Sequence, residues 1–430
     1  MKKSNFIKST IILLIGGFIT KILGMIIKII TSRMLGTEGI GIYMLITPTF
    51  SLFIAIAQLG FPIAISKLVA EETKNNKNLV FSIIPIAMFI NIIILFFIFI
   101  SSNFISNELL HESRTKIAII CIGFVLPFIS ISSIIRGYFF GKQKMIPHVV
   151  SNVTEDIIRI IIIIFGIPVF IKKGLEFAVA FLVISNIISE LTSILILFLF
   201  LPKNFKMQKK DFVPNKQNLK DIFSISIPTT SSRLIGNIGY FLEPIILTNT
   251  LLHVGYNNNF IINEYGIISG YVLPLLLLPS FFTMAISQAL IPIISKSTSA
   301  RNYTYAKNKL KQAIFFSLLI GIPMTILFEI VPEIPLKLIY NTNEGINYIR
   351  VLAPICLLHY IQAPLASTLK AMGKAKDALK GTIVGIILRT SSLFIFSSLK
   401  IGMWGLIIAT TINIIYVTIY DASRIKKYLN

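Results

Sequence analysis

A few charged side chains lie inside long apolar stretches of this 430-residue chain, and their types could do chemistry. Arg233 and Glu243 stand in the apolar run SSRLIGNIGYFLEP, residues 231–244. A charge in an apolar environment is costly, so such residues usually face a partner or a water-filled space. The guanidinium of Arg233 has five donors in a fixed fork, which suits a phosphate or pyrophosphate. We therefore expect Arg233 to bind an anionic substrate, and Glu243, about 15 Å further along a helix, to act in coupling or gating.

A second cationic stretch lies near the start of the chain. Lys21-Ile-Leu-Gly24 is echoed by Arg233-Leu-Ile-Gly236, so a cation and a glycine recur in the two halves of the sequence. Lys28 is seven residues after Lys21 and shares its helix face. We expect both lysines to bind an anionic head group in a central cavity. The alternative for Lys28 is that its ammonium group reaches the outer interface of the membrane.

A third group occupies the run SNVTEDIIRIIII, which contains Glu155, Asp156 and Arg159. Glu155 and Arg159 are spaced i,i+4, and Asp156 and Arg159 are spaced i,i+3, so both acids can pair with the arginine. The excess carboxylate could take a proton or a cation, and Arg159 could bind substrate. The alternative is an interfacial salt bridge. Three further charges also lie in or beside apolar runs. We expect Arg136 and Glu190 to be interfacial or inter-helix structural residues, and Arg389 to be a further cavity candidate after those named above.

The composition identifies the elements that must carry these residues. Apolar residues make up 55% of the chain and charged residues 13%, whereas soluble domains are about 25% charged. Apolar runs of about 20 residues, long enough to cross a bilayer, recur along the whole length. We predict an all-α integral membrane protein with twelve transmembrane helices, at roughly 7–31, 39–66, 78–102, 116–138, 146–171, 176–201, 220–248, 266–295, 309–332, 345–369, 378–399 and 402–423.

The longest polar stretch lies near the middle of the chain. We predict that 203–219 is a cytoplasmic basic linker between an N-terminal six-helix half, 1–202, and a C-terminal six-helix half, 220–430. Six helices return the chain to the same side, so the halves form a parallel repeat, and such repeats place the substrate path between them. Most Lys and Arg residues fall in alternate connectors. This bias predicts a multi-pass protein of the cytoplasmic membrane with both termini in the cytoplasm, forming a V-shaped bundle around a central cavity.

Prolines inside the predicted helices could bend them. Proline removes a backbone hydrogen bond and kinks a helix, and neighbouring helices can satisfy the freed carbonyl in a membrane. We expect Pro228, Pro274 and Pro279 to be hinges, because they lie in helices expected to line the cavity. The other helical prolines fit a packing role.

Several functional classes find no support in the sequence. The net charge of +22 is spread over short connectors rather than along one basic face, which argues against a nucleic-acid partner. The sequence has no Walker A motif, no Cys or His set with zinc spacing and no G-x-S-x-G turn. We therefore expect a protein that is not an enzyme and that has no cofactor and no metal site.

Five stretches occur in an order that resembles a known family: Thr20-Lys-Ile-Leu-Gly24, Leu59-Gly-Phe-Pro-Ile-Ala-Ile-Ser-Lys-Leu-Val-Ala-Glu71, Arg136-Gly-Tyr-Phe-Phe-Gly141, Tyr240-Phe-Leu-Glu-Pro244 and Gly270-Tyr-Val-Leu-Pro274. They are similar to stage V sporulation protein B and its relatives, in the multidrug/oligosaccharidyl-lipid/polysaccharide exporter superfamily. The resemblance implies a flippase for a polyprenyl-pyrophosphate-linked cell-wall precursor, with spore cortex peptidoglycan as one destination. It also implies a cavity cation at the position of Lys21. The related lipid II flippases carry a further arginine in the second helix, which this chain lacks.

Three functions remain open on the sequence. The first is the flippase, with a lipid-linked oligosaccharide substrate, membrane lipid around it, H⁺ or Na⁺ as coupling ion, and a monomeric state. The second, in the same superfamily, is a cation-coupled multidrug antiporter or an exporter of another lipid-linked polysaccharide; the antiporter would need a buried carboxylate facing the cavity. The third is a membrane glycosyltransferase or ligase for the same lipid carrier. It would need catalytic acids or arginines in a large outer loop, whereas the predicted outer loops are short.

Overall fold

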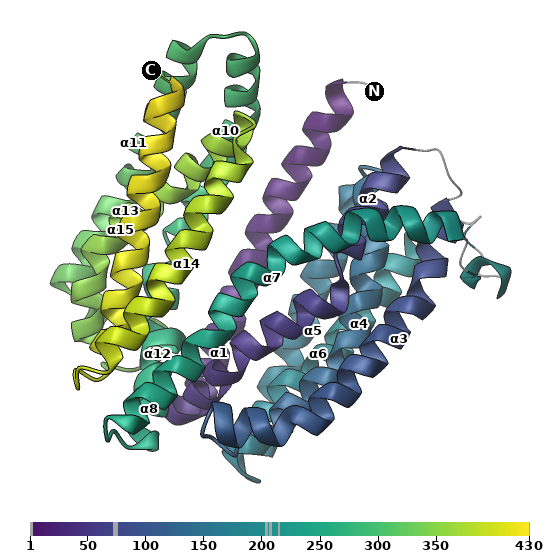
Figure 1. Cartoon of the computed structure of the whole chain (residues 1–430). Coiled ribbons are helices and arrows are strands. Elements are labelled where there is room, and N and C mark those ends of the chain that lie inside the picture. Colours follow the sequence, from purple (N-terminus) through teal and green to yellow (C-terminus); the bar gives the residue numbers. More distant parts are fainter. Residues whose placement is uncertain (1–2, 72–75, 203–204, 206–208, 214–215, 430) are drawn as a thin grey trace. The chain divides into compact units, whose positions relative to one another are not determined.

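The computed structural model describes residues 3–71, 76–202, 205, 209–213 and 216–429, and its regular elements there are all helices (Figure 1). Side chains 3–11, 14, 209–210 and 232 are outside this description. The elements are α1 Lys3–Gln58, α2 Phe61–Ala70, α3 Asn76–Asn103, the π-helix η1 Phe104–Leu109, α4 Thr115–Gly141, α5 Met145–Ile171, α6 Leu175–Leu199, the 3₁₀-helix η3 Lys209–Phe212, α7 Lys216–His253, α8 Asn258–Gly266, the π-helix η4 Ile267–Val272, α9 Leu273–Leu276, α10 Ser280–Ser299, α11 Tyr303–Ile330, α12 Glu333–Tyr340, α13 Ile346–Ala371, α14 Ala375–Ser397 and α15 Trp404–Leu429.

The chain divides into two compact units, Met1–Phe241 (unit 1) and Leu242–Asn430 (unit 2), and the division falls inside α7. The first part of α7 is tied to unit 1: Asn218 Nδ2 donates to Asn78 Oδ1 at 2.9 Å. The predicted halves, 1–202 and 220–430, and the predicted linker, 203–219, stay predictions; part of the linker lies outside the described residues.

The start of unit 1 contains two breaks in helical geometry. The backbone of α1 departs from the helix at Gly36 (φ 67°, ψ −176°), between the predicted helices 7–31 and 39–66. The second predicted helix is broken again near its end, where Leu59 (φ 45°) and Gly60 (φ 63°) adopt left-handed conformations before α2. Glycine adopts this conformation without a steric penalty, whereas leucine is strained in it. The break therefore separates α1 from the short helix α2.

Helix α4 packs closely against α2, the short helix that follows the break at Leu59 and Gly60. A Cβ atom on Gly137 would lie 2.6 Å from the carbonyl oxygen of Pro62, and one on Gly141 would lie 2.6 Å from that of Ser66. Small residues allow helix backbones to approach in membranes, where packing drives association. Around this contact the core of unit 1 buries apolar side chains of α2, α3, α4 and α6, among them Phe61, Ile83, Phe139 and Leu197.

Gly137→Ala is expected to destabilise unit 1, because the added methyl group would collide with the backbone of α2. Overpacking of this kind costs about 1–3 kcal/mol, and we expect a lower thermal unfolding midpoint of the purified protein. Gly17→Ala is the matched control, since a Cβ on Gly17 meets no atom within 4 Å. Equal midpoints for the two variants would contradict this packing.

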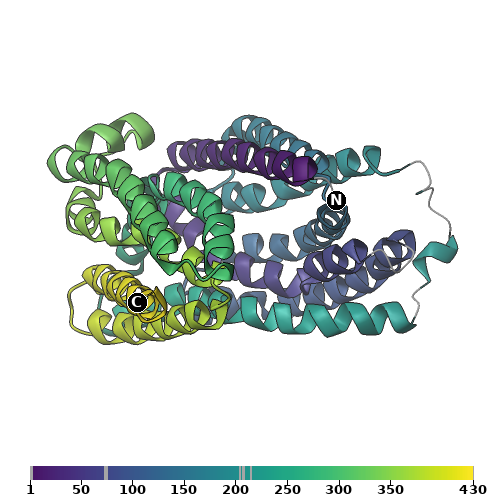
Figure 2. The same ribbon diagram turned by 90° about the horizontal axis from the view of Figure 1, so that it is seen from above.

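The membrane segment that follows α7 in unit 2 is a bent series of short helices. The predicted helix 266–295 is formed by α8, η4, α9 and α10, and its two parts, Asn258–Leu276 and Ser280–Ser299, meet at a bend of 50°. Further along the chain, α14 and α15 pack side by side (Figure 2). The core between α10, α11, α13 and α15 includes Leu290, Leu310, Leu369 and Ile425.

Eight helices within the described residues are long and apolar enough to cross a membrane, or nine when the bent pair is one crossing. Their 18-residue windows reach a mean hydropathy of 3.0 in Asn76–Leu109. The protein is therefore a multi-pass, all-helical membrane protein.

Candidate functional site

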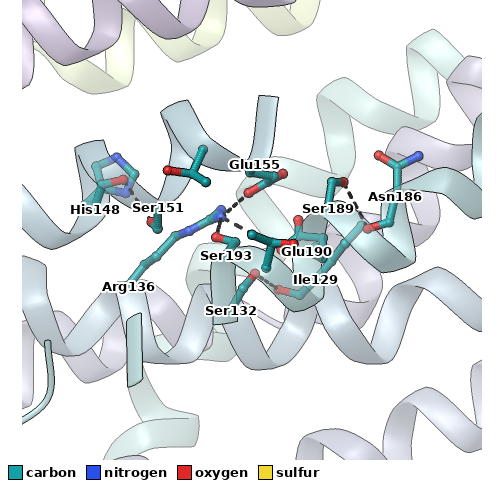
Figure 3. A network of polar contacts seen from close by, with 12 residues as sticks. Ile129, Ser132, Arg136, His148, Ser151, Glu155, Asn186, Ser189, Glu190 and Ser193 are labelled. Carbon is teal, nitrogen blue, oxygen red and sulfur yellow. Dashed lines mark hydrogen bonds and ion pairs between the residues drawn. The ribbon is translucent and has the colours of Figure 1, made fainter. Parts of the chain in front are cut away.

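Arg136 is the centre of a buried polar network in unit 1 (Figure 3). Its Nη2 atom donates to Glu155 Oε2 at 2.5 Å and to Ser193 Oγ at 2.6 Å, and lies 3.8 Å from Glu190 Oε2. The side chains of Arg136, Glu155 and Glu190 are 17%, 15% and 8% exposed. One guanidinium thus compensates two carboxylates from two other helices.

Local packing explains why these side chains meet. Gly137 faces α2, so its neighbour Arg136 on α4 is directed toward another side, where α5 and α6 lie (Figure 3). Glu190 and Ser193 are spaced i,i+3 on α6 and therefore share one face. Ser189 Oγ, on the same helix, donates to the carbonyl of Asn186 at 3.1 Å. The hydroxyl of Ser189 is therefore satisfied within α6, whereas that of Ser193 accepts from Arg136 across helices.

The network contains more acid than base. Asp156 and Arg159 on α5 are close enough to interact electrostatically with members of the network. Asp156 interacts with Glu155 and Arg136, and Arg159 interacts with Glu190. Three carboxylates thus meet two guanidinium groups. Several buried atoms of this region form no hydrogen bond with the described residues: Arg136 Nε, Asn152 Oδ1, Arg159 Nε and Glu190 Oε2. Buried polar atoms of this kind usually signal ordered water, which could donate to Asn152 Oδ1 and Glu190 Oε2 and accept from the two Nε–H groups.

The pairing differs from the sequence expectation. Glu155 pairs across helices with Arg136 rather than along α5 with Arg159, and no ion pair within 4.0 Å joins Glu155 or Asp156 to Arg159. Arg136 and Glu190, which we expected to be interfacial or inter-helix structural residues, do meet between helices, and they lie at the centre of the network. The sequence does show a cation, Arg136, and an anion, Glu190, in separate apolar runs. Residue spacing, however, identifies ion-pair partners only within one helix.

Lys21 and Lys28 lie on α1 and are both exposed. The depth of Lys21 follows from the packing of α1. A Cβ on Gly16 would lie 2.3 Å from Val149 of α5, and one on Gly39, just past the break at Gly36, would lie 3.1 Å from Leu175, the first residue of α6, which follows α5 in the chain. The two helices therefore run in the same direction, and Lys21 lies about 7.5 Å beyond the Gly16 contact. This is close to the depth of the acidic residues of α5.

Arg233 lies on α7, beside the break between α1 and α2. Its Nη1 atom donates to Gln58 Oε1 at 3.4 Å, and its side chain is exposed. At Gly60 a Cβ would lie 2.9 Å from the carbonyl oxygen of Ser226, so α7 packs tightly on the break. An amide oxygen is a neutral acceptor and leaves the charge of Arg233 uncompensated. The guanidinium can therefore bind an anion.

Glu243 has a direct partner in unit 2. It is 5% exposed, its Oε2 lies 2.6 Å from Arg389 Nη2, and Tyr265 donates to its Oε1 at 3.4 Å. Arg389 also reaches Thr410 Oγ1 at 3.5 Å. Helices α7, α8, α14 and α15 are thus joined by one buried ion pair. The sequence places Glu243 and Arg389 in or beside apolar runs, but it did not predict that they form an ion pair.

The predicted hinge prolines occupy different settings. Pro228 is inside the continuous helix α7, where Thr230 Oγ1 donates to the carbonyl of Ser226 at 2.7 Å. Pro274 begins α9 directly after a π-helix. Pro279 is the N-cap of α10, at the 50° bend. The structure therefore places one of the three at an observed bend, and motion at any of them stays a prediction.

Two family models match the chain. The model described as "Polysaccharide biosynthesis protein" matches residues 6–298, and the model "MatE" matches residues 269–395. Stage V sporulation protein B of Bacillus subtilis (strain 168) is 33% identical over 441 residues, covering 100% of this chain and 85% of that protein. Lipid II flippase MurJ of the same organism is 22% identical and covers 99% of this chain and 83% of that protein.

The fold is also similar to solved structures. A multidrug resistance MATE family transporter of the MOP superfamily, in an inward-facing conformation, matches with a TM-score of 0.72 and 17% identity. The match covers 95% of each chain. At this identity the similarity establishes the fold alone, which is MATE-like.

Proposed function

Because the chain belongs to the polysaccharide biosynthesis protein family of MOP-superfamily transporters, we propose that it is a flippase for a lipid II-like precursor. The substrate would be a polyprenyl-pyrophosphate-linked oligosaccharide that crosses the cytoplasmic membrane by alternating access. Its use in the spore cortex is supported by similarity to stage V sporulation protein B. The chain acts as a transporter rather than an enzyme, so no covalent step is required.

The observation that carries this proposal is an uncompensated cationic group in unit 1. Within the described residues, the guanidinium of Arg233 bonds to the neutral amide of Gln58 and to no carboxylate. Lys21 and Lys28 are exposed on α1. A pyrophosphate needs several positive donors, and a guanidinium can bind it with two parallel hydrogen bonds. Together with Arg159, these cations replace the water around the head group, while the polyprenyl tail stays in lipid.

Twelve crossings are consistent with the helix lengths. Helix α1 supplies two crossings, one on each side of Gly36, and the bent pair supplies one. Helix α5 has 27 residues and is about 40 Å long, enough for a hydrocarbon core of about 30 Å; its charged residues keep it out of the apolar set. Helix α7, with 38 residues, completes the twelve. We propose cytoplasmic termini, two six-helix halves around a central cavity, and a monomer.

We propose that the Arg136 network couples transport to H⁺ or Na⁺. The surplus carboxylate among Glu155, Asp156 and Glu190 would take the cation, and the prolines Pro228, Pro274 and Pro279 would let helices bend during exchange. Glu243 is held by Arg389, so its role would be gating through that ion pair.

Glu190→Gln is expected to remove the response of transport to an imposed proton or sodium gradient. The amide keeps the size of the side chain but binds no proton at these pH values and lacks the negative charge that attracts Na⁺. The measurement is uptake of labelled lipid into proteoliposomes with and without each gradient. Glu333→Gln is the control, because Glu333 is 43% exposed and its ion pair within the described residues is the exposed one with Arg350. A full gradient response in Glu190→Gln would reject the coupling site.

A second candidate is a cation-coupled multidrug antiporter, which the surplus of buried acid in unit 1 favours. The two functions differ in substrate charge. The test is thermal stabilisation of the purified protein by undecaprenyl pyrophosphate and by a cationic dye, together with drug resistance on overexpression. Stabilisation by the pyrophosphate alone supports the flippase. Stabilisation by the dye with raised resistance supports the antiporter, and stabilisation by neither ligand contradicts a pyrophosphate site.

A further inference from the structure

Asp421 is a buried carboxylate in unit 2 that has no partner among the described residues. It lies on α15 and is 2% exposed. Its Oδ1 atom is buried without a hydrogen bond. A Cβ on Gly381 of α14 would lie 3.3 Å from that oxygen, so the glycine is what lets α14 approach so closely. The carboxylate is therefore covered by a helix that offers it no donor.

This arrangement differs from that of the other buried acids in the described chain. Glu112 lies 2.7 Å from Arg114, Glu190 lies 3.8 Å from Arg136, Asp211 lies 2.6 Å from Lys77 and Glu243 lies 2.6 Å from Arg389. Each of these carboxylates has a cation within 4.0 Å. Asp421 has none, so its negative charge would be unbalanced.

The charged groups around Asp421 are engaged elsewhere or held apart. On α13, Lys370 acts on it electrostatically but is exposed and forms no ion pair with it. On α14, Asp377 accepts a hydrogen bond from Tyr428 at 2.5 Å, and Lys376 and Lys380 are exposed. The ammonium group of Lys374, the N-cap of α14, lies 4.8 Å from the ring centroid of Tyr428.

The remaining neighbours follow the same pattern. On α15 itself, the Arg424 guanidinium lies 5.0 Å from the ring centroid of Tyr420. Helix α11 supplies apolar side chains, Ala306, Leu310 and Ala313, to the core nearby, and its Lys309 donates to Gln312 at 3.0 Å.

We propose that Asp421 is a proton-binding site of unit 2. An ionised carboxylate that is buried without a partner is strongly unfavourable, and a bound counter-ion removes that penalty. A proton needs only one oxygen lone pair, whereas a metal cation requires several oxygen ligands around it. The carboxylate takes one proton from water and becomes a neutral acid while α13, α14 and α15 are packed. When these helices separate it releases the proton to water, and Lys370 becomes its counter-charge.

The site lies near the end of its helix, where exchange with water is possible. Asp421 is eight residues before Leu429, the last residue of α15, which is about 12 Å along the axis. Lys426 and Lys427 in the final turn mark the approach to the aqueous interface. This proposal does not depend on which substrate the protein transports.

The test uses the full-length protein in lipid nanodiscs. Difference infrared spectra between mildly alkaline and mildly acidic pH are recorded for the wild type, Asp421→Asn and Asp377→Asn. We expect a carboxylic acid C=O band that Asp421→Asn removes and Asp377→Asn retains. Asp377 is the matched control because it lies at the same end of the unit and has a hydroxyl partner.

Thermal unfolding supplies a second readout. The wild type should lose stability as pH rises and its Asp421 carboxyl ionises, and Asp421→Asn should lose clearly less stability over the same pH range. The proposal is overturned if Asp421→Asn keeps the infrared band, or if both proteins respond equally to pH. It is also overturned if NaCl rather than acid restores the alkaline stability of the wild type, since the occupant is then Na⁺.

Discussion

Arg233→Glu is expected to abolish flipping of a lipid II-like substrate while the protein still inserts into the membrane. The substitution removes hydrogen bonds from a charged donor, each worth about 1.5–3 kcal/mol, and adds repulsion from the pyrophosphate. Since 1.4 kcal/mol is about tenfold, the rate should fall by at least roughly tenfold. Insertion should persist because the side chain is exposed and bonded only weakly, at 3.4 Å, to Gln58. The measurement is the initial flipping rate in proteoliposomes containing equal amounts of protein.

Two controls separate substrate binding from general charge effects. Arg233→Lys keeps the charge but loses the two-pronged geometry, so it should retain part of the rate. Lys173→Glu reverses an exposed charge that lies near an aromatic ring, with Nζ 5.6 Å from the ring centroid of Phe170. This variant should be as active as the wild type. Full activity of Arg233→Glu would remove Arg233 from the substrate site.

Arg136→Met is expected to have the largest effect on stability. The substitution leaves Glu155 and Glu190 buried in unit 1 without their common counter-charge. Removal of one partner from a buried ion pair costs about 3–5 kcal/mol, and here two carboxylates lose it. We expect a markedly lower thermal unfolding midpoint and less folded protein in the membrane.

The matched comparison is an exposed ion pair of the same type. Arg350 and Glu333 lie 3.0 Å apart with exposed fractions of 45% and 43%, and such pairs contribute about 0–1 kcal/mol. Arg350→Met should therefore leave the midpoint nearly unchanged. Replacing the acids as well, in Arg136→Met with Glu155→Gln and Glu190→Gln, should recover much of the lost stability. No difference between the two single variants would show that the Arg136 network is not a buried ionic centre.

The membrane fold could be predicted from the sequence because apolar run length is a local property. The runs around Asn76–Leu109 and Thr115–Gly141 are long enough to span a bilayer regardless of their neighbours. The interruption at Gly36 falls in the predicted connector. The break at Leu59 and Gly60 could not be predicted, because it depends on the packing of Gly60 against Ser226, far along the chain. The resemblance to the family of stage V sporulation protein B is confirmed by a relative that is 33% identical over the whole chain.

The candidate site could be predicted only in part, for a related reason. The sequence identifies which charges are inside apolar runs, and Glu155 and Glu243 are in fact buried or partly buried. It does not specify contacts between helices, so the pairs of Arg136 with Glu155 and of Arg389 with Glu243 were not predicted, although Arg136 was expected to be an interfacial or inter-helix structural residue. The cationic candidates Lys21, Lys28 and Arg233 are identified by type and position, and their role in binding substrate stays a prediction.

The central claim is that this protein moves a pyrophosphate-linked lipid between leaflets. The most direct test is a leaflet-accessibility assay with labelled lipid II in proteoliposomes, in which a membrane-impermeant reagent reports how much lipid has changed sides. We predict that wild-type protein exposes the inner-leaflet lipid with time and that protein-free vesicles do not. If the wild type behaves like the protein-free vesicles with lipid II and with other polyprenyl-pyrophosphate glycans, the flippase account is contradicted.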